Sequence, residues 1–500
     1  MLAMSSRRRW FVTIGVMTGM LLAALESTVV GTAMPTIVAA LGGLAHYSWV
    51  FSAYLLTSTV TVPVWGKLSD LFGRRRLFQI GVAVFLIGSA ACGFAQTMTQ
   101  LIVGRAVQGL GAGALVPLAM TIIGDIFTLE ERAKMQGFFS GVWGLSSIFG
   151  PLVGGFITDQ LSWRWVFLLN LPVGIAAALI IGIALREPPR HERPSIDYLG
   201  STVLTVAVTI LLLVLGAQNL ATPRNMVLIA LVVASLFWFI RIEQRAKDPV
   251  VPLGLFRNRV VAVAVGVGFL SGIAMFAVIT FVPLLAQGVF GATATEAGSY
   301  LTPLMLSWVI VSIIGGRLLI RFGSRVLVIL GLILMLAGFV ALATFTRNTP
   351  PALMMFELVV IGAGLGLTMF TLLVASQHSV PREQLGITTS LNQFSRSIGG
   401  AIGVAILGAL LAAGLAQFAS DPNALVNPEA RAHIAPAELA QLQGALEGTL
   451  QNIFWTCVAV VAIALAGAFT LPHGAVGEVH GERLVIAEMT NIDPENEPEA

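Results

Sequence analysis

The stretch G-K-L-S-D-L-F-G-R-R-R runs from Gly66 to Arg76 and decides how the rest of the chain is interpreted. It separates two apolar segments that are too long for the core of a soluble domain, so it is a short charged turn between membrane helices. Gly66 and Gly73 allow a tight turn and a close approach of helices. Asp70 supplies a negative charge, and the arginines from Arg74 to Arg76 are typical of the cytoplasmic side of a membrane.

Composition supports a single polytopic membrane protein rather than several soluble domains. The 500 residues are 56% hydrophobic and only 11% charged, with a mean hydropathy of +0.89. A net charge of +3 is too small to favour a nucleic-acid partner. Cys92 and Cys457 both lie in apolar segments, and no C-x-x-C or His/Cys cluster is present. The sequence therefore predicts no metal site, redox site or cofactor.

The chain is predicted to be all-helical, with fourteen membrane-spanning segments. A bilayer core requires about 20 apolar residues per helix. Segments of that kind lie near residues 11–34, 47–66, 77–95, 99–121, 136–158, 164–185, 197–217, 223–241, 259–285, 298–318, 325–345, 352–375, 388–413 and 452–471.

The distribution of Lys and Arg predicts the orientation of these helices. Most of the 28 positive residues fall in alternate loops, and the opposite loops hold only Arg164, Arg224, Arg347 and Arg431. Because positive residues collect on the cytoplasmic side, we expect both termini to be cytoplasmic. We also expect the protein to be a monomer in the lipid bilayer of the plasma membrane.

An internal repeat indicates two related halves. Gly66, Gly73 and Arg75 recur 250 residues later as Gly316, Gly323 and Arg325, whereas Ile320 takes the place of Asp70. The second copy thus keeps the turn and loses the acid.

The repeat predicts four parts of the chain. Residues 1–195 form an N-terminal six-helix half, 196–245 an inserted helix pair, and 246–475 a C-terminal six-helix half; residues 476–500 form an acidic cytoplasmic tail. The second half includes a long external loop, 416–451, in which Pro436 to Leu450 could form a surface helix.

Glu26 is the main candidate for chemistry in the first helix, which reads L-E-S-T-V-V-G-T-A-M-P from Leu25 to Pro35. It lies deep in the membrane, nearer the outer side, where an ionised carboxylate is costly. One interpretation is a carboxylate that alternates between a proton and a substrate. The other is a structural glutamate that is hydrogen-bonded between helices.

Arg105 is the second candidate, at a depth comparable with that of Glu26. Arg105, Gln108 and Gly109 share one face of the fourth helix. A buried arginine cannot shed its proton and needs a polar or anionic partner. Glu26 is one such partner, and backbone carbonyls at a helix interface are the alternative.

The fifth helix is rich in glycine. Spacings of four residues let a neighbouring helix approach closely, and a proline adds a bend. We expect this helix to form a smooth contact on which two halves move, through Gly144, Gly150, Pro151, Gly154 and Gly155.

Two further polar positions lie within helices of the second half. Glu357 aligns in the repeat with Gly104, next to Arg105, and either lines a cavity or is satisfied by packing. Asn392, Gln393 and Arg396 lie in the cytoplasmic half of the penultimate helix, where we expect Arg396 to stabilise the inward end.

These motifs together resemble the major facilitator superfamily, and most closely its fourteen-helix branch of drug:proton antiporters. The turn from Gly66 resembles the superfamily's signature between helices 2 and 3. G-R-A-V-Q-G-L-G-A-G (104–113), G-L-S-S-I-F-G-P-L-V-G-G (144–155) and N-Q-F-S-R-S-I-G-G-A-I-G (392–403) resemble the remaining signatures. Glu26 departs from the branch, which often has aspartate there.

The resemblance implies roles for individual residues. Glu26 would be the proton and substrate site, with Glu357 as a further candidate, and Arg105 part of the proton relay. Gly66, Asp70, Gly73 and Arg74 would form the cytoplasmic gate.

The function that follows is proton-coupled export of hydrophobic, often cationic drugs, with protons and small molecules as partners. Export of a dedicated lipid, siderophore or metabolite is the alternative, because fold does not fix substrate. A membrane enzyme or a sensor that does not transport is less favoured, since no H-E-x-x-H, G-x-S-x-G or P-loop motif is present.

Overall fold

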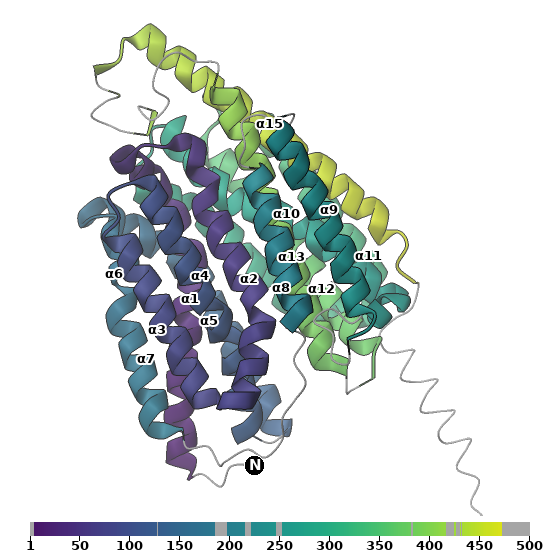
Figure 1. Cartoon of the computed structure of the whole chain (residues 1–500). Helices are drawn as coiled ribbons and strands as arrows, with labels where there is room; N and C mark the ends of the chain where they lie inside the picture. Colours follow the sequence, from purple (N-terminus) through teal and green to yellow (C-terminus); the bar gives the residue numbers. More distant parts are fainter. Residues whose placement is uncertain are drawn as a thin grey trace, which may run out of the picture.

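The computed structural model describes residues 5–127, 129–185, 198–215, 222–246, 253–381, 384–416, 425–426, 431 and 433–472. Within these ranges, all regular secondary structure is helical, and the helices form one elongated bundle (Figure 1).

Two groups of helices make up the bundle. The first helix group contains α1 (Ser6–Leu41), α2 (Tyr47–Phe72), α3 (Arg74–Gly93), α4 (Met98–Ile126), α5 (Leu129–Gln160), α6 (Arg164–Leu168) and α7 (Asn170–Ala184). The second helix group contains α10 (Arg259–Gly288), α11 (Ala294–Ala343), α12 (Pro351–His378), α13 (Leu385–Leu415) and α15 (Pro436–Ala468). Between them in sequence, α8 (Tyr198–Leu215) and α9 (Pro223–Glu243) pack on each other. Short 3-10 helices occupy Leu44–His46 and Leu253–Arg257.

The start of α1 marks one end of the bundle, which we call the Ser6 end; the other is the Leu41 end. At the Ser6 end, the Nε atom of Arg8 donates to the carbonyl of Ala184 at 2.7 Å. Arg9 pairs with Glu131 of α5 at 3.2 Å. These contacts tie the start of α1 to the end of α7 and the start of α5.

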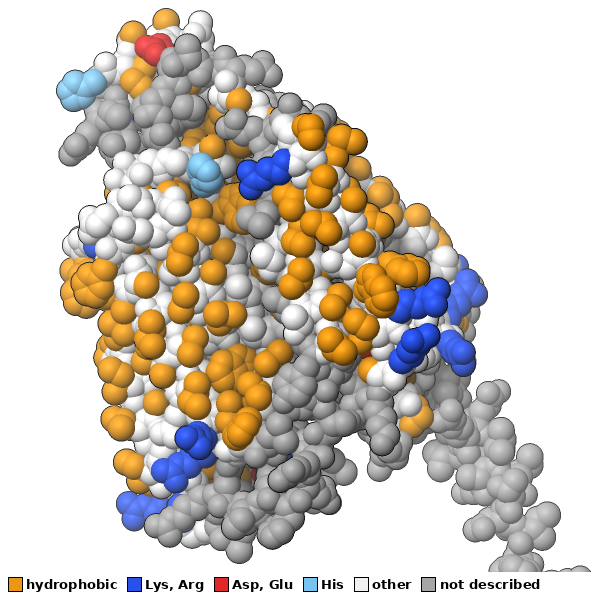
Figure 2. All heavy atoms as spheres, viewed as in Figure 1, with side chains coloured by type: hydrophobic (Ala, Val, Ile, Leu, Met, Phe, Trp, Pro, Cys, Tyr) orange, Lys and Arg blue, Asp and Glu red, His pale blue; other side chains and the backbone are white. Residues whose placement is uncertain are grey.

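Twelve helical segments in the described ranges are long and apolar enough to cross a membrane, by length and composition. Hydrophobic side chains cover the flank of the bundle, and most Lys and Arg on the visible face gather in two groups, one at the lower left and one at the right (Figure 2). The sequence predicted fourteen such segments. Two of the predicted segments are not among the twelve. One is α2, which is helical but rich in Ser and Thr, and the other is α8, whose apolar part Thr202–Leu211 is shorter.

The two copies of the repeated turn share one backbone feature. Gly73 and Gly323 both have positive φ angles, of 92° and 74°, a conformation that favours glycine. Gly73 separates α2 from α3, and Gly323 breaks α11. The two apolar segments of α11, Ala294–Leu319 and Arg321–Ala343, correspond to two helices predicted separately.

Helix α15 differs from the sequence prediction. A separate surface helix from Pro436 to Leu450 and a later membrane helix were expected, yet one helix runs unbroken from Pro436 to Ala468. Leu442 and Leu446 in its first turns are buried. This burial explains the difference, because the predicted surface segment packs on the second helix group.

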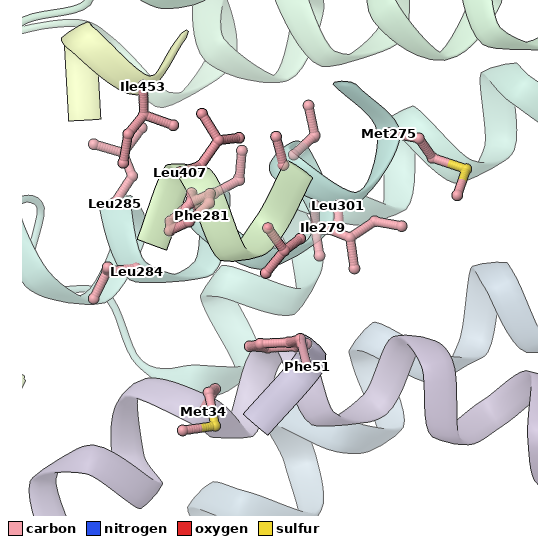
Figure 3. Packing of buried hydrophobic residues seen from close by; sticks show 14 of the residues in the cluster. Met34, Phe51, Met275, Ile279, Phe281, Leu284, Leu285, Leu301, Leu407 and Ile453 are labelled. Atoms are coloured by element: carbon pink, nitrogen blue, oxygen red, sulfur yellow. The ribbon is translucent and has the colours of Figure 1, made fainter. Parts of the chain in front are cut away.

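The two groups share a hydrophobic core towards the Leu41 end (Figure 3). Met34 and Phe51 of the first group belong to the same buried cluster as Ile279 and Leu301 of the second. Hydrogen bonds reinforce it: the Tyr47 hydroxyl donates to the Thr280 carbonyl at 2.8 Å. Towards the same end, the Nε2 atom of Gln287 donates to the carbonyl of Thr32 at 2.9 Å.

Candidate functional site

Glu26 and Arg105 form a buried ion pair in the first helix group. The Oε1 atom of Glu26 on α1 accepts from the Nη1 atom of Arg105 on α4. The two side chains are only 1% and 2% exposed, respectively. A pair this deeply buried needs further hydrogen bonds to offset the desolvation of both charges.

Arg105 obtains hydrogen bonds from two neighbours and a cation–π contact from a third. Its Nε atom donates to the carbonyl of Val50 at 3.2 Å, and Nη1 also donates to Oε1 of Gln108 at 2.7 Å. The guanidinium carbon lies 4.1 Å from the centre of the Tyr54 ring, a cation–π distance. Both alternatives for Arg105 are thus realised, since it binds a carboxylate and a backbone carbonyl.

The second oxygen of Glu26 is held by Asn170 at the start of α7. The Nδ2 atom of Asn170 donates to Oε2 of Glu26 at 2.7 Å and to Oγ of Ser89 at 2.9 Å. Ser89 on α3 also accepts from Gln108 at 3.1 Å and donates to the carbonyl of Phe167 at 2.8 Å. The carboxylate therefore sits in a closed network built from α1, α3, α4 and α7.

Glycines allow the helices of this network to approach one another. A Cβ atom at Gly88 would lie 2.2 Å from the backbone nitrogen of Gln108, and one at Gly109 would lie 2.5 Å from the carbonyl of Tyr54. Any side chain at either position would separate α3 or α2 from α4. A helix break before Asn170 places that residue in the first turn of α7.

Ser89, Tyr54 and Asn170 were not predicted from the sequence. The available signal was weak: Asn170 is an isolated amide in the apolar segment 164–185, and Ser89 an isolated hydroxyl in 77–95. An isolated polar residue in a membrane helix is a candidate for function. The sequence could not show which helices the three residues face.

Glu357 lies apart from this network. It is 6% exposed on α12, and its backbone carbonyl would lie 3.1 Å from a Cβ atom at Gly338 of α11. Its Oε2 atom has no hydrogen-bond partner among the described residues. The structure thus places Glu357 at the α11–α12 contact, without a bond to Glu26 or Arg105.

The predicted gate residues lie at the Ser6 end. Arg74 forms an ion pair with Asp125 of α4 and donates from Nη1 to the carbonyl of Thr121 at 3.1 Å. A Cβ atom at Gly66 would meet nothing within 4 Å. The side chain of Asp70 lies outside the described residues, so its predicted pairing with Arg74 stays a prediction. The sequence analysis had overlooked Asp125.

The glycine-rich part of α5 contacts both helix groups. A Cβ atom at Gly150 would lie 2.0 Å from Oγ1 of Thr28, and one at Gly154 would lie 2.6 Å from the carbonyl of Val29, both on α1. A Cβ atom at Gly155 would lie 2.5 Å from the carbonyl of Ala294 on α11. Further along the same interface, Pro151 meets Gly298 and Gly144 faces Val309.

The penultimate-helix polar residues lie on α13. Asn392 donates to Oγ of Ser376 and to the carbonyl of Thr388, both at 2.9 Å. Arg396 donates to Oε1 of Gln393 in the preceding turn. These residues belong to the second helix group and do not contact the Glu26 network.

The arrangement around Glu26 suits exchange of a charge rather than covalent chemistry. Protonation of Glu26 would neutralise one member of the ion pair and leave Arg105 as an unmatched cation. No cluster of three or more His, Cys, Asp or Glu residues in the described ranges could hold a metal ion.

Comparisons with known proteins agree with the fold and with the transport-related motifs. A model of the Major Facilitator Superfamily matches residues 16–404. Multidrug transporter protein MdtP of Bacillus subtilis (strain 168) is 41% identical over 90% of this chain and 84% of its own. Multidrug resistance protein 3 of the same organism is 35% identical over 93% of this chain and 95% of its own.

A solved structure shows the same fold. The crystal structure of a bacterial homologue of the human lysosomal transporter Spinster, in an inward-facing and unoccupied conformation, matches with a TM-score of 0.68. The match has 18% sequence identity and covers 93% of this chain and 98% of that chain.

Proposed function

The chain belongs to the Major Facilitator Superfamily of membrane transporters, and on this premise we propose that it is a proton-coupled exporter of hydrophobic, often cationic compounds. Two relatives named for multidrug transport or resistance, at 41% and 35% identity, support this substrate class. The buried carboxylate of Glu26 is the observation that carries the proposal, because it provides a single group for which a proton and a cation compete.

Coupling arises from what each form of Glu26 attracts. The ionised carboxylate attracts a cationic substrate strongly in a low-dielectric site, whereas the protonated form has no net charge and releases it. A ligand that binds two conformations with equal affinity does not shift the equilibrium between them. Competition at one carboxylate makes proton and substrate favour different states, because a substrate cation must displace the proton from Glu26 to bind.

Alternating access follows from contacts between the helix groups. In our proposal the Leu41 end faces the exterior and is closed here by the shared core and by α5 against α11. The Ser6 end faces the cytoplasm, where Asp70 and Arg74 form the gate that holds the opposite state. Movement of the groups about the glycines of α5 exposes Glu26 to each side in turn.

The finer architecture belongs to the same proposal. We assign fourteen membrane helices, with α2 and α8 added to the twelve long apolar segments. They form two six-helix halves and the inserted α8–α9 pair, in a monomer at the plasma membrane with both termini cytoplasmic. Supporting this orientation, Arg8, Arg9 and Arg74 all lie at the Ser6 end.

Transport in proteoliposomes tests the proposal. Purified protein is reconstituted, a pH gradient is imposed, and movement of the fluorescent cation ethidium is followed. We expect movement that depends on the gradient and is lost in Glu26→Gln, while Gln79→Ala retains it. Equal movement with and without a gradient, or in the Glu26→Gln variant, contradicts the proposed coupling.

A further inference from the structure

Arg396 carries a positive charge on α13 and has no acidic partner among the described residues. Its guanidinium makes one hydrogen bond, to Oε1 of Gln393, and no ion pair within the described part of the chain. The buried arginine of the first group, Arg105, is by contrast bound to Glu26. The guanidinium of Arg396 stays charged, because an arginine does not lose its proton in a protein, and it retains donors for an anionic partner.

Gln393 adds a hydrogen-bond donor beside Arg396. Because Oε1 of Gln393 accepts from Arg396, the Nε2 donor of Gln393 is left without a partner among the described residues. The Nδ2 atom of Asn392 is already committed to Ser376 and Thr388. Arg396 and Gln393 together therefore present several N–H groups and no acceptor, which is the arrangement that recognises a carboxylate.

The polar face of α13 is partly exposed. Ser390 and Gln393 are exposed, while Arg396 is half-buried. Helix α13 also packs on α2 of the first group, where Oγ of Ser52 donates to the carbonyl of Ala401 at 3.2 Å, so Arg396 belongs to a helix that joins the two groups.

The backbone at Arg396 is held in place. A Cβ atom at Gly272 of α10 would lie 2.3 Å from the carbonyl oxygen of Arg396. Ser395, the residue before it, donates to the carbonyl of Val265 of α10 at 2.7 Å. The guanidinium thus projects from a fixed point, which lowers the entropy cost of binding an anionic group.

We propose that Arg396 and Gln393 form a recognition site for a carboxylate on the transported compound, so that zwitterionic amphiphiles are substrates together with cations. The inference rests on the proposed export function and narrows its substrate class. The cationic part of such a compound is drawn to Glu26 in the first group, and its carboxylate to Arg396 in the second.

A matched pair of dyes tests this site. Rhodamine 6G and rhodamine 19 share one xanthene cation, and the benzoic acid group is an ester in the first and free in the second. Binding of each to the purified full-length protein is measured by fluorescence anisotropy. We expect Arg396→Gln to weaken binding of rhodamine 19 by about tenfold or more and to leave rhodamine 6G within about twofold. Arg396→Lys should fall between the wild type and Arg396→Gln, because lysine keeps the charge without the planar fork.

Arg321→Gln is the control for loss of one positive charge, since Arg321 is exposed on α11; it should bind both dyes as the wild type does. Equal weakening of both dyes by Arg396→Gln would assign Arg396 a structural role, and unchanged binding of both would remove it from recognition. Either result would contradict the carboxylate site. The export function would still be supported if the protein showed normal proton-driven efflux of rhodamine 6G. A wild type that neither binds nor exports either dye overturns both proposals.

Discussion

Asn170 donates from its side-chain nitrogen to the Oε2 atom of Glu26 at 2.7 Å and so ties α7 to α1 at the buried carboxylate. Arg105 occupies the other oxygen. One oxygen is thus held by a permanent cation and the other by a neutral amide. The account predicts that removing the amide impairs coupling without abolishing the ion pair.

Asn170→Ala tests this division. The variant leaves one carboxylate oxygen and the Ser89 hydroxyl short of a donor, at a cost of about 1 to 3 kcal/mol. We expect proton-driven ethidium transport to fall by about tenfold. Gln79→Ala is the control, since Gln79 also joins α3 to α7, through the Ala178 carbonyl at 3.2 Å, away from Glu26. An equal loss in both variants would show that helix packing, and not the carboxylate, is responsible.

Gly155→Ala tests the contact between the helix groups. The added Cβ atom would lie 2.5 Å from the carbonyl of Ala294, so α5 and α11 must separate, at a cost of about 1 to 3 kcal/mol. We expect a lower melting temperature and reduced transport. Gly141→Ala in the same helix meets nothing within 4 Å and should change neither quantity. Similar behaviour of the two variants would argue against a special role for this contact.

The hydrogen bonds of Asp159 indicate how the Leu41 end is closed. Its carboxylate accepts from the backbone nitrogens of Ala294 and Thr295, at 3.2 and 2.8 Å, and thereby caps α11 of the second group from α5 of the first. Asp159→Ala should favour opening of this end. The measurement is the rate at which an impermeant maleimide labels a cysteine placed at Thr36. The native Cys92 and Cys457 are buried and should contribute little labelling.

The control for this experiment is Glu296→Gln, which alters a capping interaction within α11 alone. We expect labelling to become several-fold faster in Asp159→Ala only. An unchanged rate would mean that Asp159 does not restrain the closed state.

Asp70→Asn tests the gate at the Ser6 end. Loss of the negative charge should weaken attraction to the positive end of a neighbouring helix and to Arg74, by about 1 to 2 kcal/mol. We expect impaired transport with an unchanged melting temperature. Ile320→Asp, at the equivalent position of the second copy, should not restore it. Normal transport by Asp70→Asn would refute its gating role.

The sequence was most informative where periodicity and depth determine position. Apolar length located the helices, and the equal depths of Glu26 and Arg105 suggested that they could pair. Asn170 and Ser89 could not be found in this way, because their roles depend on a helix break and on which faces of α3 and α7 meet α1. Likewise, the ion pair of Arg74 with Asp125 joins residues 51 positions apart on two helices, which no local pattern encodes.

The boundaries of α15 illustrate a further limit of the sequence. Its first turns are amphipathic enough to suggest a separate surface helix, and only tertiary packing shows that Leu442 and Leu446 are buried. For the same reason the environment of Glu357, at the contact with Gly338, could not be read from the repeat alone.

The central claim is that Glu26 exchanges a proton for the substrate, and substrate-induced proton release measures this most directly. Purified protein in weakly buffered solution at neutral pH is mixed with ethidium, and released protons are followed with a pH indicator in the wild type, Glu26→Asp and Glu26→Gln. The account predicts release by the wild type, partial release by Glu26→Asp and none by Glu26→Gln, whose amide cannot ionise. If Glu26→Gln releases as many protons per bound substrate as the wild type, the coupling site lies elsewhere, and Glu357 becomes the next residue to test.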